Sequence, residues 1–197
     1  MSSGGVGPCG PVPPLLTARN RDMERLARLA AALPRGAHAI GSWLLLFLAF
    51  VIGYDVLGRK FFDTGSIMLQ DLQWHLHGAA LMLGLGAAYL RDAHVRVDLF
   101  RENFTRRTKL WLEIFGIVLF LIPYASILFW FSIDYVVRAY VTGEGSVAGA
   151  GLSHRWIIKS FLTIGFALVV FSAVAVLLRA IDCLRDRDGT SMPFVED

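Results

Sequence analysis

The sequence has few charged residues, and this shortage limits the kinds of protein it can encode. Asp, Glu, Lys and Arg make up 18% of the 197 residues, against the roughly 25% usual in soluble domains. Hydrophobic residues make up 55% of the chain, and its mean hydropathy is +0.56. This composition indicates an integral membrane protein.

Cysteine is also scarce. Cys9 and Cys183 lie near opposite ends of the chain, so neither a disulfide framework nor a metal-binding spacing is present. The first residues lack an apolar core followed by a cleavage site, so we expect no secretory signal peptide. The sequence contains no His-Glu-x-x-His and no Gly-x-Ser-x-Gly motif. We therefore predict that the chain is not an enzyme and holds no catalytic residue, metal or cofactor of its own.

Long apolar runs account for most of the sequence. Four of them, each about long enough for the ~30 Å hydrocarbon core of a bilayer, cover residues 37–57, 67–89, 110–137 and 156–178. We therefore predict an all-α membrane protein whose four transmembrane helices form one domain over residues 37–180. The third run is longer than a span requires and contains Pro123, so we expect it to tilt and to kink.

The residues before the first run divide into two parts. Residues 1–14 are rich in Gly, Pro and Ser, which predicts disorder. Residues 15–33 fit a basic amphipathic helix on the membrane surface, which Pro34 and Gly36 would end. A partly ordered polar leader explains them equally well. The apolar positions of this helix are Met23, Leu26, Leu29, Ala30 and Leu33, and the basic ones are Arg19, Arg21, Arg25 and Arg28.

The distribution of basic residues predicts the orientation. Most of the 19 Lys and Arg residues lie before the first run, between the second and third, or in the charged tail over residues 181–197. By the positive-inside rule both termini are then cytoplasmic, because an even number of spans separates them. Between the second and third runs we expect an interfacial segment, with Arg96, Arg106 and Arg107 at the membrane surface. Since the basic residues sit between apolar runs rather than in one patch, we expect no nucleic-acid binding.

The second run has two distinct halves. Ala80, Gly84 and Ala88 recur every four residues, which favours close approach of another helix. Asp71 and His75 near its start share a helix face and are able to hydrogen-bond. This polar half is interpreted as a contact face for a partner subunit, as a paired structural group, or as a ligand or proton site. We favour the first interpretation.

Four short motifs follow one another along the chain: Asp55-Val56-Leu57-Gly58-Arg59-Lys60-Phe61-Phe62, Leu69-Gln70-Asp71-Leu72-Gln73-Trp74-His75-Leu76-His77, Ala93-His94-Val95-Arg96-Val97-Asp98 and Gly151-Leu152-Ser153-His154-Arg155-Trp156-Ile157-Ile158-Lys159. Together they make the chain resemble the small membrane subunit, of DctQ type, of the tripartite ATP-independent periplasmic (TRAP) transporters. The first motif is similar to the family's Asp-Val-x-x-Arg-x-x-Phe, and the second to Gln-Glu-Leu-x-Trp-His-Leu-His, with Asp71 where the family usually has Glu. The third resembles His-Val-x-Val-Asp, and the fourth Gly-Gly-Leu-Pro-x-Arg-Trp-Leu-x-Lys, with Ser153 where Pro is common.

The resemblance implies an accessory subunit in the bacterial inner membrane. It would anchor a large DctM-type subunit, in a one-to-one complex that imports an organic acid delivered by a periplasmic binding protein. Coupling to an ion gradient, usually Na⁺, would belong to the large subunit, which moves as an elevator. The residues expected to contact that subunit are Asp55, Arg59, Asp71, Trp74, His75, Gly78, Arg155 and Lys159.

Two other functions are compatible with four helices. A haem-binding redox anchor would place His75 or His77 opposite His154 across a haem b. A self-sufficient exporter or channel would need no partner. We expect neither, because His154 lies beside a Gly-rich loop and short helices leave little room for a substrate pathway.

Overall fold

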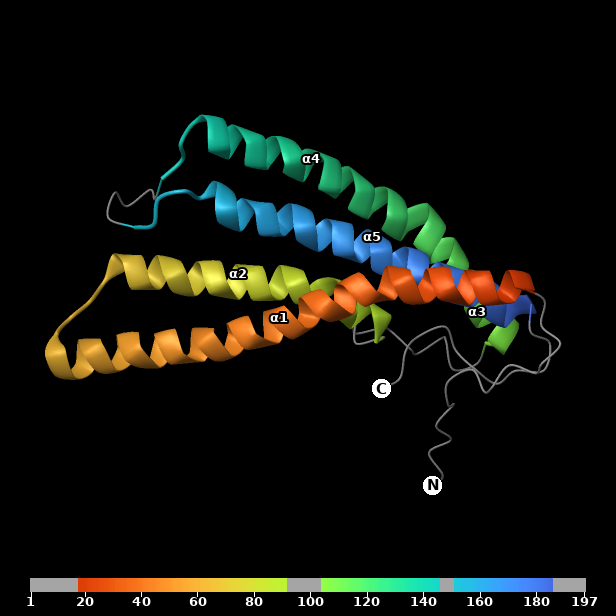
Figure 1. Cartoon of the computed structure of the whole chain (residues 1–197), viewed down its shortest axis with the longest axis horizontal. Coiled ribbons are helices and arrows are strands. Elements are labelled where there is room, and N and C mark those ends of the chain that lie inside the picture. The colour runs from red at the N-terminus through yellow and green to blue at the C-terminus, as the bar shows by residue number, and fades with distance from the viewer. Residues whose placement is uncertain (1–17, 92–103, 146–150, 186–197) are drawn as a thin grey trace, which may run out of the picture.

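The computed structural model describes residues 18–91, 104–145 and 151–185, and in these ranges it contains helices and no strands. Its elements are α1 (Ala18–Phe62), α2 (Ile67–Leu90), α3 (Arg106–Gly116), the π-helical turn η1 (Ile117–Leu121), α4 (Ile122–Val141) and α5 (Trp156–Arg185). Since α3, η1 and α4 are contiguous, the chain forms four helical rods (Figure 1). The all-α prediction is confirmed.

Three of the described rods are long and apolar enough to cross a membrane: Glu24–Phe62, Arg107–Val141 and Trp156–Leu184. The prediction of four such helices is wrong at α2. The Gln, Asp and His residues between Gln70 and His77 lower the hydropathy of that helix. Because α2 packs on both α1 and α5, Gln73 meets Asp55 of α1 on one side and Asp71 meets Leu152, before α5, on the other.

α1 continues through Pro34 for 45 residues, so the predicted helix end at Pro34 and Gly36 is wrong. Proline removes one backbone hydrogen bond from a helix, but tertiary packing offsets this loss here. Ala27 and Ala31 are fully buried, and Pro34 is among the largest fully buried side chains. The segment predicted to lie on the membrane surface therefore packs against the rest of the chain along one face.

The predicted kink and tilt stay predictions, but the backbone before Pro123 does depart from α-helical geometry. Proline cannot donate the hydrogen bond expected one turn earlier. The helix accommodates this with the π-helical turn Ile117–Leu121, directly before Pro123 at the start of α4. Such turns widen a helix locally without ending it, so the third rod stays continuous.

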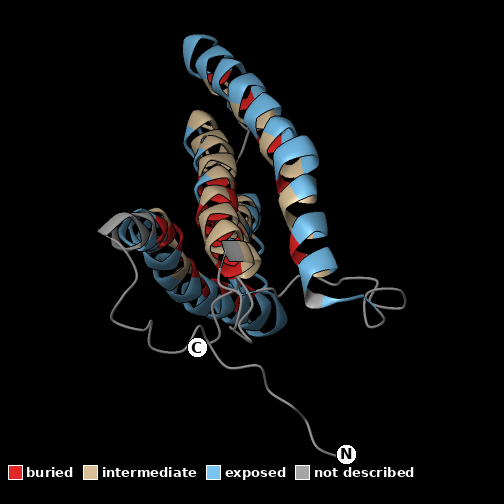
Figure 2. Cartoon of the chain, turned by 90° about the vertical axis from the view of Figure 1, so that its right-hand side faces the viewer, coloured by how far each residue is buried: buried red, intermediate tan, exposed pale blue. Residues whose placement is uncertain are grey.

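α5 is the central helix of the described structure. It packs on α1, α2, α3 and α4, whereas α4 packs on neither α1 nor α2. Figures 1 and 2 show α4 standing away from α1, with exposed residues along most of its surface. The first described residue of α1 and the last of α5 lie at the same end of the molecule (Figure 1).

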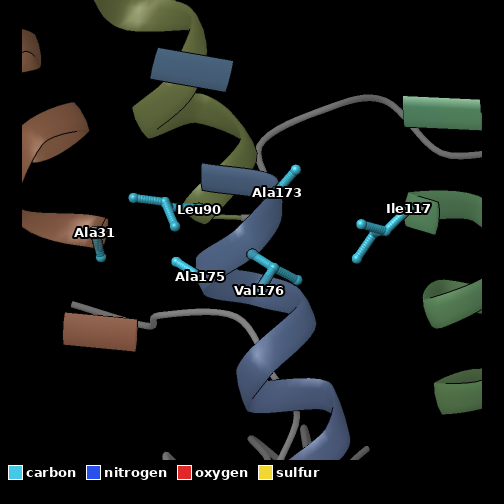
Figure 3. Close-up of a cluster of buried hydrophobic side chains, with 6 residues drawn as sticks. All are labelled: Ala31, Leu90, Ile117, Ala173, Ala175 and Val176. Atoms are coloured by element: carbon cyan, nitrogen blue, oxygen red, sulfur yellow. The ribbon is translucent and has the colours of Figure 1, made fainter. Parts of the chain in front are cut away.

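The main apolar core lies toward that end. It combines Ala31 of α1, Leu90 of α2 and Ile117 of η1 with Ala173, Ala175 and Val176 of α5 (Figure 3). Small side chains on the central helix let its neighbours approach closely. A smaller cluster of Leu110, Ala180 and Cys183 continues the packing of α3 on α5.

Close helix contacts depend on glycine and alanine, although not always on those predicted. Ala80 is buried at the contact with α1, where a Cβ built on Gly41 would lie 3.1 Å from the carbonyl oxygen of Ala80. Gly84 has only a distant neighbour, with His38 Nδ1 at 3.9 Å from a Cβ built there. The tighter contact is at Gly86, whose Cβ would lie 2.9 Å from the carbonyl oxygen of Leu168 on α5.

Candidate functional site: the polar end of the helix bundle

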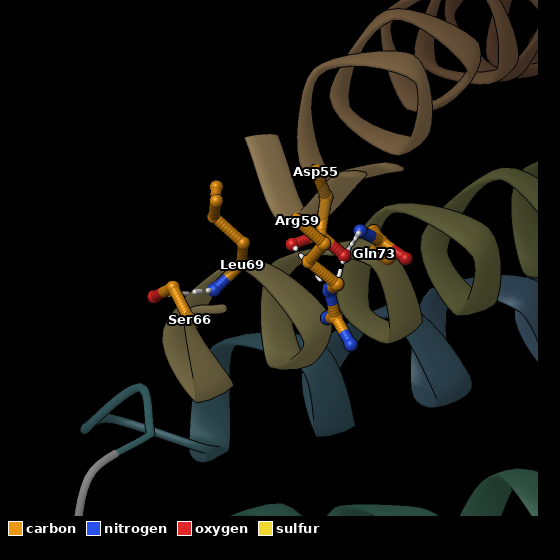
Figure 4. Close-up of polar contacts among 5 residues, drawn as sticks. All are labelled: Asp55, Arg59, Ser66, Leu69 and Gln73. Carbon is orange, nitrogen blue, oxygen red and sulfur yellow. Dashed lines mark hydrogen bonds and ion pairs between the residues drawn. The ribbon is translucent and has the colours of Figure 1, made fainter. Parts of the chain in front are cut away.

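The end of the bundle opposite the main core carries a network of charged and amide side chains. We call it the polar end, and it comprises the α1–α2 turn, the first turns of α2, and the described residues between α4 and α5. Asp55 accepts hydrogen bonds at Oδ1 from Arg59 Nε (3.2 Å) and at Oδ2 from Arg59 Nη2 (2.7 Å) (Figure 4). Gln73 Nε2 on α2 donates to the same Oδ2 over 3.1 Å (Figure 4). This carboxylate therefore links α1 to α2.

The α1–α2 turn is held by local interactions on both sides. Asp63 adopts a left-handed conformation (φ 52°) that ends α1, and Ser66 Oγ caps α2 by accepting from Leu69 N over 3.4 Å (Figure 4). A Cβ on Gly58 would lie 2.8 Å from Thr64 Oγ1. The turn therefore folds closely over the end of α1 and places Gln73 beside Asp55.

Asp71 connects α2 to the segment before α5. Its Oδ2 accepts a hydrogen bond from the backbone N of Leu152 over 3.1 Å. His75 does meet Asp71, but its Nδ1 lies 2.6 Å from the Asp71 backbone carbonyl oxygen rather than from the carboxylate. The His75 Nδ1 therefore carries the proton in this contact, and its Nε2 is buried without a hydrogen-bond partner.

Lys159 joins α5 to the end of α4. Its Nζ lies 2.5 Å from Glu144 Oε2 and 3.8 Å from the centre of the Tyr135 ring. The Lys159 side chain is only 12% exposed, so the ion pair and the aromatic ring replace most of its contact with solvent. The backbone N of Arg155 also donates to the carbonyl oxygen of Glu144 over 3.2 Å. The described ends of this connection are thus tied to each other.

The residues predicted to contact a partner divide into two groups. Asp55, 5% exposed, is buried and engaged within the chain. Gly78 faces Ile158 of α5, whose Cδ1 would lie 3.5 Å from a Cβ built on that glycine. By contrast, Trp74 is 74% exposed, and the Arg59 side chain is 41% exposed. Partner contact stays a prediction for all of them, and Trp74 and Arg59 are the ones most available for it.

The sequence did not single out several members of the network. Gln73, Glu144 and Tyr135 hold Asp55 and Lys159 in place. Gln73 lies one turn after Gln70, a spacing that signals a shared helix face. With its amide oxygen turned toward α1, Gln70 accepts from the Arg59 guanidinium. No sequence signal pairs Glu144 with Lys159, because the two come together only when the loop folds back.

The residues predicted at the membrane surface are only partly described. Arg25, Arg28 and Arg107 are exposed on α1 and α3, and Arg28 lies 3.7 Å from Glu24. The side chains of Arg19, Arg21 and Arg106, the whole of Arg96 and the predicted interfacial segment around it lie outside the described residues. Their contact with lipid remains a prediction.

The haem interpretation receives no support from this geometry. A haem between helices would bury both axial histidines. His154 is exposed, adopts a left-handed conformation (φ 67°) and places its Nδ1 3.1 Å from Ser153 Oγ. In the part of the chain that the structure describes, no group of three or more His, Cys, Asp or Glu side chains is arranged to hold a metal ion.

The fold and the polar end define a multi-pass helical membrane protein in which Asp55, Asp71 and Lys159 link neighbouring parts of the chain. A family model described as tripartite ATP-independent periplasmic transporters, DctQ component, matches residues 48–183. Since this match covers more than two thirds of the chain, the protein belongs to the DctQ family of TRAP transporter components and is a multi-pass protein of the inner membrane. The predicted resemblance is confirmed. No curated protein and no solved structure gives a significant match.

Proposed function

We propose that this chain is the static anchoring subunit of a TRAP transporter that imports an organic acid. It binds a large DctM-type subunit one-to-one, while a periplasmic binding protein delivers the substrate and an ion gradient, usually of Na⁺, drives uptake through the large subunit. The chain itself carries no cofactor and catalyses no reaction. The family membership supports the transporter assignment, and the static role is our own inference.

The observation that carries the static role is the internal use of charge at the polar end. Asp55 joins α1 to α2, Asp71 joins α2 to the segment before α5, and Lys159 joins α5 to Glu144. A subunit that resists the sliding of its partner needs helices that keep their relative positions. Buried ion pairs and hydrogen bonds between helices oppose such displacement.

Orientation follows from the same arrangement. The start of α1, the end of α2 and the end of α5 lie toward one end of the bundle (Figure 1). These segments, with the residue after α2, contain Arg25, Arg28, Arg91 and Arg179. We place this end in the cytoplasm by the positive-inside rule and the polar end toward the periplasm. In a cysteine-free variant, a membrane-impermeant maleimide added to intact cells should label Asp63→Cys. If Asp63→Cys is labelled only after the cells are lysed, the polar end faces the cytoplasm and the proposed orientation is wrong.

The direct test is co-purification. The tagged chain is expressed with and without the large subunit, and the detergent-extracted complex is measured by size-exclusion chromatography with mass determination. We expect a one-to-one complex. A stable chain that elutes alone in the presence of the large subunit would overturn the proposal.

One substitution tests the polar end within that assay. Asp71→Ala removes the acceptor for Leu152 N and should lower recovery of the complex at least threefold. Asp134→Ala is the matched control, because this carboxylate is 73% exposed and its pairing with Arg138, at 3.7 Å, is an exposed and therefore weak ion pair. Unchanged recovery for Asp71→Ala, in protein of normal thermal stability, would refute its role.

A further inference from the structure

α1 carries an exposed apolar stripe along most of its length. Starting at Leu26, steps of three and four residues alternate without interruption as far as Phe61. Every position on this path is exposed, and all except Gly36 are apolar. The large side chains on it are between 55% (Leu57) and 82% (Phe50) exposed. We call this set of positions the α1 stripe.

Aromatic residues concentrate on the α1 stripe. α1 contains six aromatic residues, and five of them lie on it: Trp43, Phe47, Phe50, Tyr54 and Phe61. Contact with lipid tails does not require aromatic residues to lie along one side of a helix. A 3-4 spacing of large side chains does match the seam along which a second helix packs, because those positions face one partner continuously.

The α1 stripe is too long for lipid tails to cover. It extends over 36 residues from Leu26 to Phe61, which corresponds to about 53 Å at 1.5 Å per residue. The hydrocarbon core is only ~30 Å thick, and an average tilt of about 20° shortens the projected length very little. Part of the stripe therefore lies beyond the lipid tails wherever the helix sits.

The end near Leu26 is the part most in need of a protein partner. Leu26, Leu29 and Leu33 are 57%, 68% and 56% exposed, and the same stretch of helix carries Arg25, Arg28 and Arg35. This segment cannot turn to lie flat on the membrane, because its opposite side, at Ala27 and Ala31, is fully buried against the chain. Exposed leucines in a fixed upright helix are typical of an interface.

We propose that the α1 stripe is the seam on which a long transmembrane helix of the large subunit packs. This inference rests on the proposed function, because it assigns a surface to the partner already named. The occupant must cross the membrane and continue past it, as the stripe does. A periplasmic binding protein cannot do so, and a lipid cannot cover the segment at Leu26–Leu33.

Site-specific photocrosslinking tests the seam in the assembled complex. A photoreactive phenylalanine analogue replaces Leu33 or Phe50 on the stripe, and Arg35 or Ile52 as matched controls. Each control is exposed and lies two residues further on, about 200° around the helix. We expect crosslinks to the large subunit from positions 33 and 50 at least tenfold stronger than from positions 35 and 52.

The outcomes separate the alternatives. Equal yields at all four positions, or adducts with lipid only, overturn the seam. Crosslinked pairs of this chain with itself would show that a second copy occupies the stripe, which also overturns it. Because the wild-type complex is isolated first, failure of the seam with an intact one-to-one complex leaves the proposed function standing. Absence of that complex would refute the proposed function itself.

Discussion

The contact between α2 and α5 allows a quantitative test of how closely this bundle is packed. Gly86→Ala would place a Cβ 2.9 Å from the Leu168 carbonyl oxygen and 2.9 Å from Ser172 Oγ. Backbone cannot move aside as a flexible side chain does, so we expect an overpacking cost of about 1–3 kcal/mol. Alanine also favours the helix by about 1 kcal/mol over glycine, which hides part of this cost.

Gly84→Ala removes that ambiguity. It makes the same change in the same helix, but its new Cβ would have one neighbour, 3.9 Å away at His38 Nδ1. The helix-propensity gain is common to both variants, so their difference isolates the steric cost. For a chain of this size about 1–3 kcal/mol corresponds to roughly 2–12 °C in Tm. We therefore expect Gly86→Ala to unfold at the lower temperature by that margin.

The assay is thermal unfolding followed by tryptophan fluorescence, with both variants in the same detergent at one scan rate. A fixed scan rate is needed because membrane proteins often unfold irreversibly. Equal unfolding temperatures for the two variants would refute the close α2–α5 contact. A lower temperature for Gly84→Ala than for Gly86→Ala would reverse the assignment of the packing face.

Two further predictions concern the polar end. Glu144→Gln leaves Lys159, which is 12% exposed, without its opposite charge and should lower Tm clearly. The control Arg138→Gln breaks an exposed pair and should change stability by less than about 1 kcal/mol. Equal effects of the two substitutions would contradict the buried pairing of Lys159 with Glu144. Asp55→Asn removes the charge that Arg59 binds and should speed hydrogen exchange of the backbone amides across the α1–α2 turn. Asp63→Asn, exposed in that same turn, is the control. Unchanged exchange for Asp55→Asn would contradict the role of Asp55 in linking α1 to α2.

Much of the polar end could be anticipated because its groups are close in sequence. Asp55 and Arg59 are four residues apart, so a helix alone brings them within reach of each other. The same spacing suggested that Asp71 and His75 interact, and they do, although through the Asp71 carbonyl oxygen. The more distant partners of these groups, Gln73 on α2 and Leu152 before α5, depend on how the helices pack.

The number of helices able to span a membrane could not be read reliably from hydrophobic runs. α2 is apolar in its second half and polar in its first, and a run of residues does not reveal which neighbours will shelter its polar groups. The continuity of α1 through Pro34 was hidden for a similar reason. A proline lowers the stability of an isolated helix, but the burial of Ala27 and Ala31 against other helices offsets that cost.

The amino-acid sequence by itself determined the class of the protein. Its apolar composition, the length of its hydrophobic runs and four short motifs predicted a helical inner-membrane protein of the DctQ type, because solvent preference and local spacing do not depend on tertiary contacts. Only the tertiary structure decided which charged side chains bond within the chain, which glycine lets α2 and α5 approach most closely, and which face of α1 is left uncovered. Those outcomes depend on distances between residues far apart in the chain, such as Asp71 and Leu152.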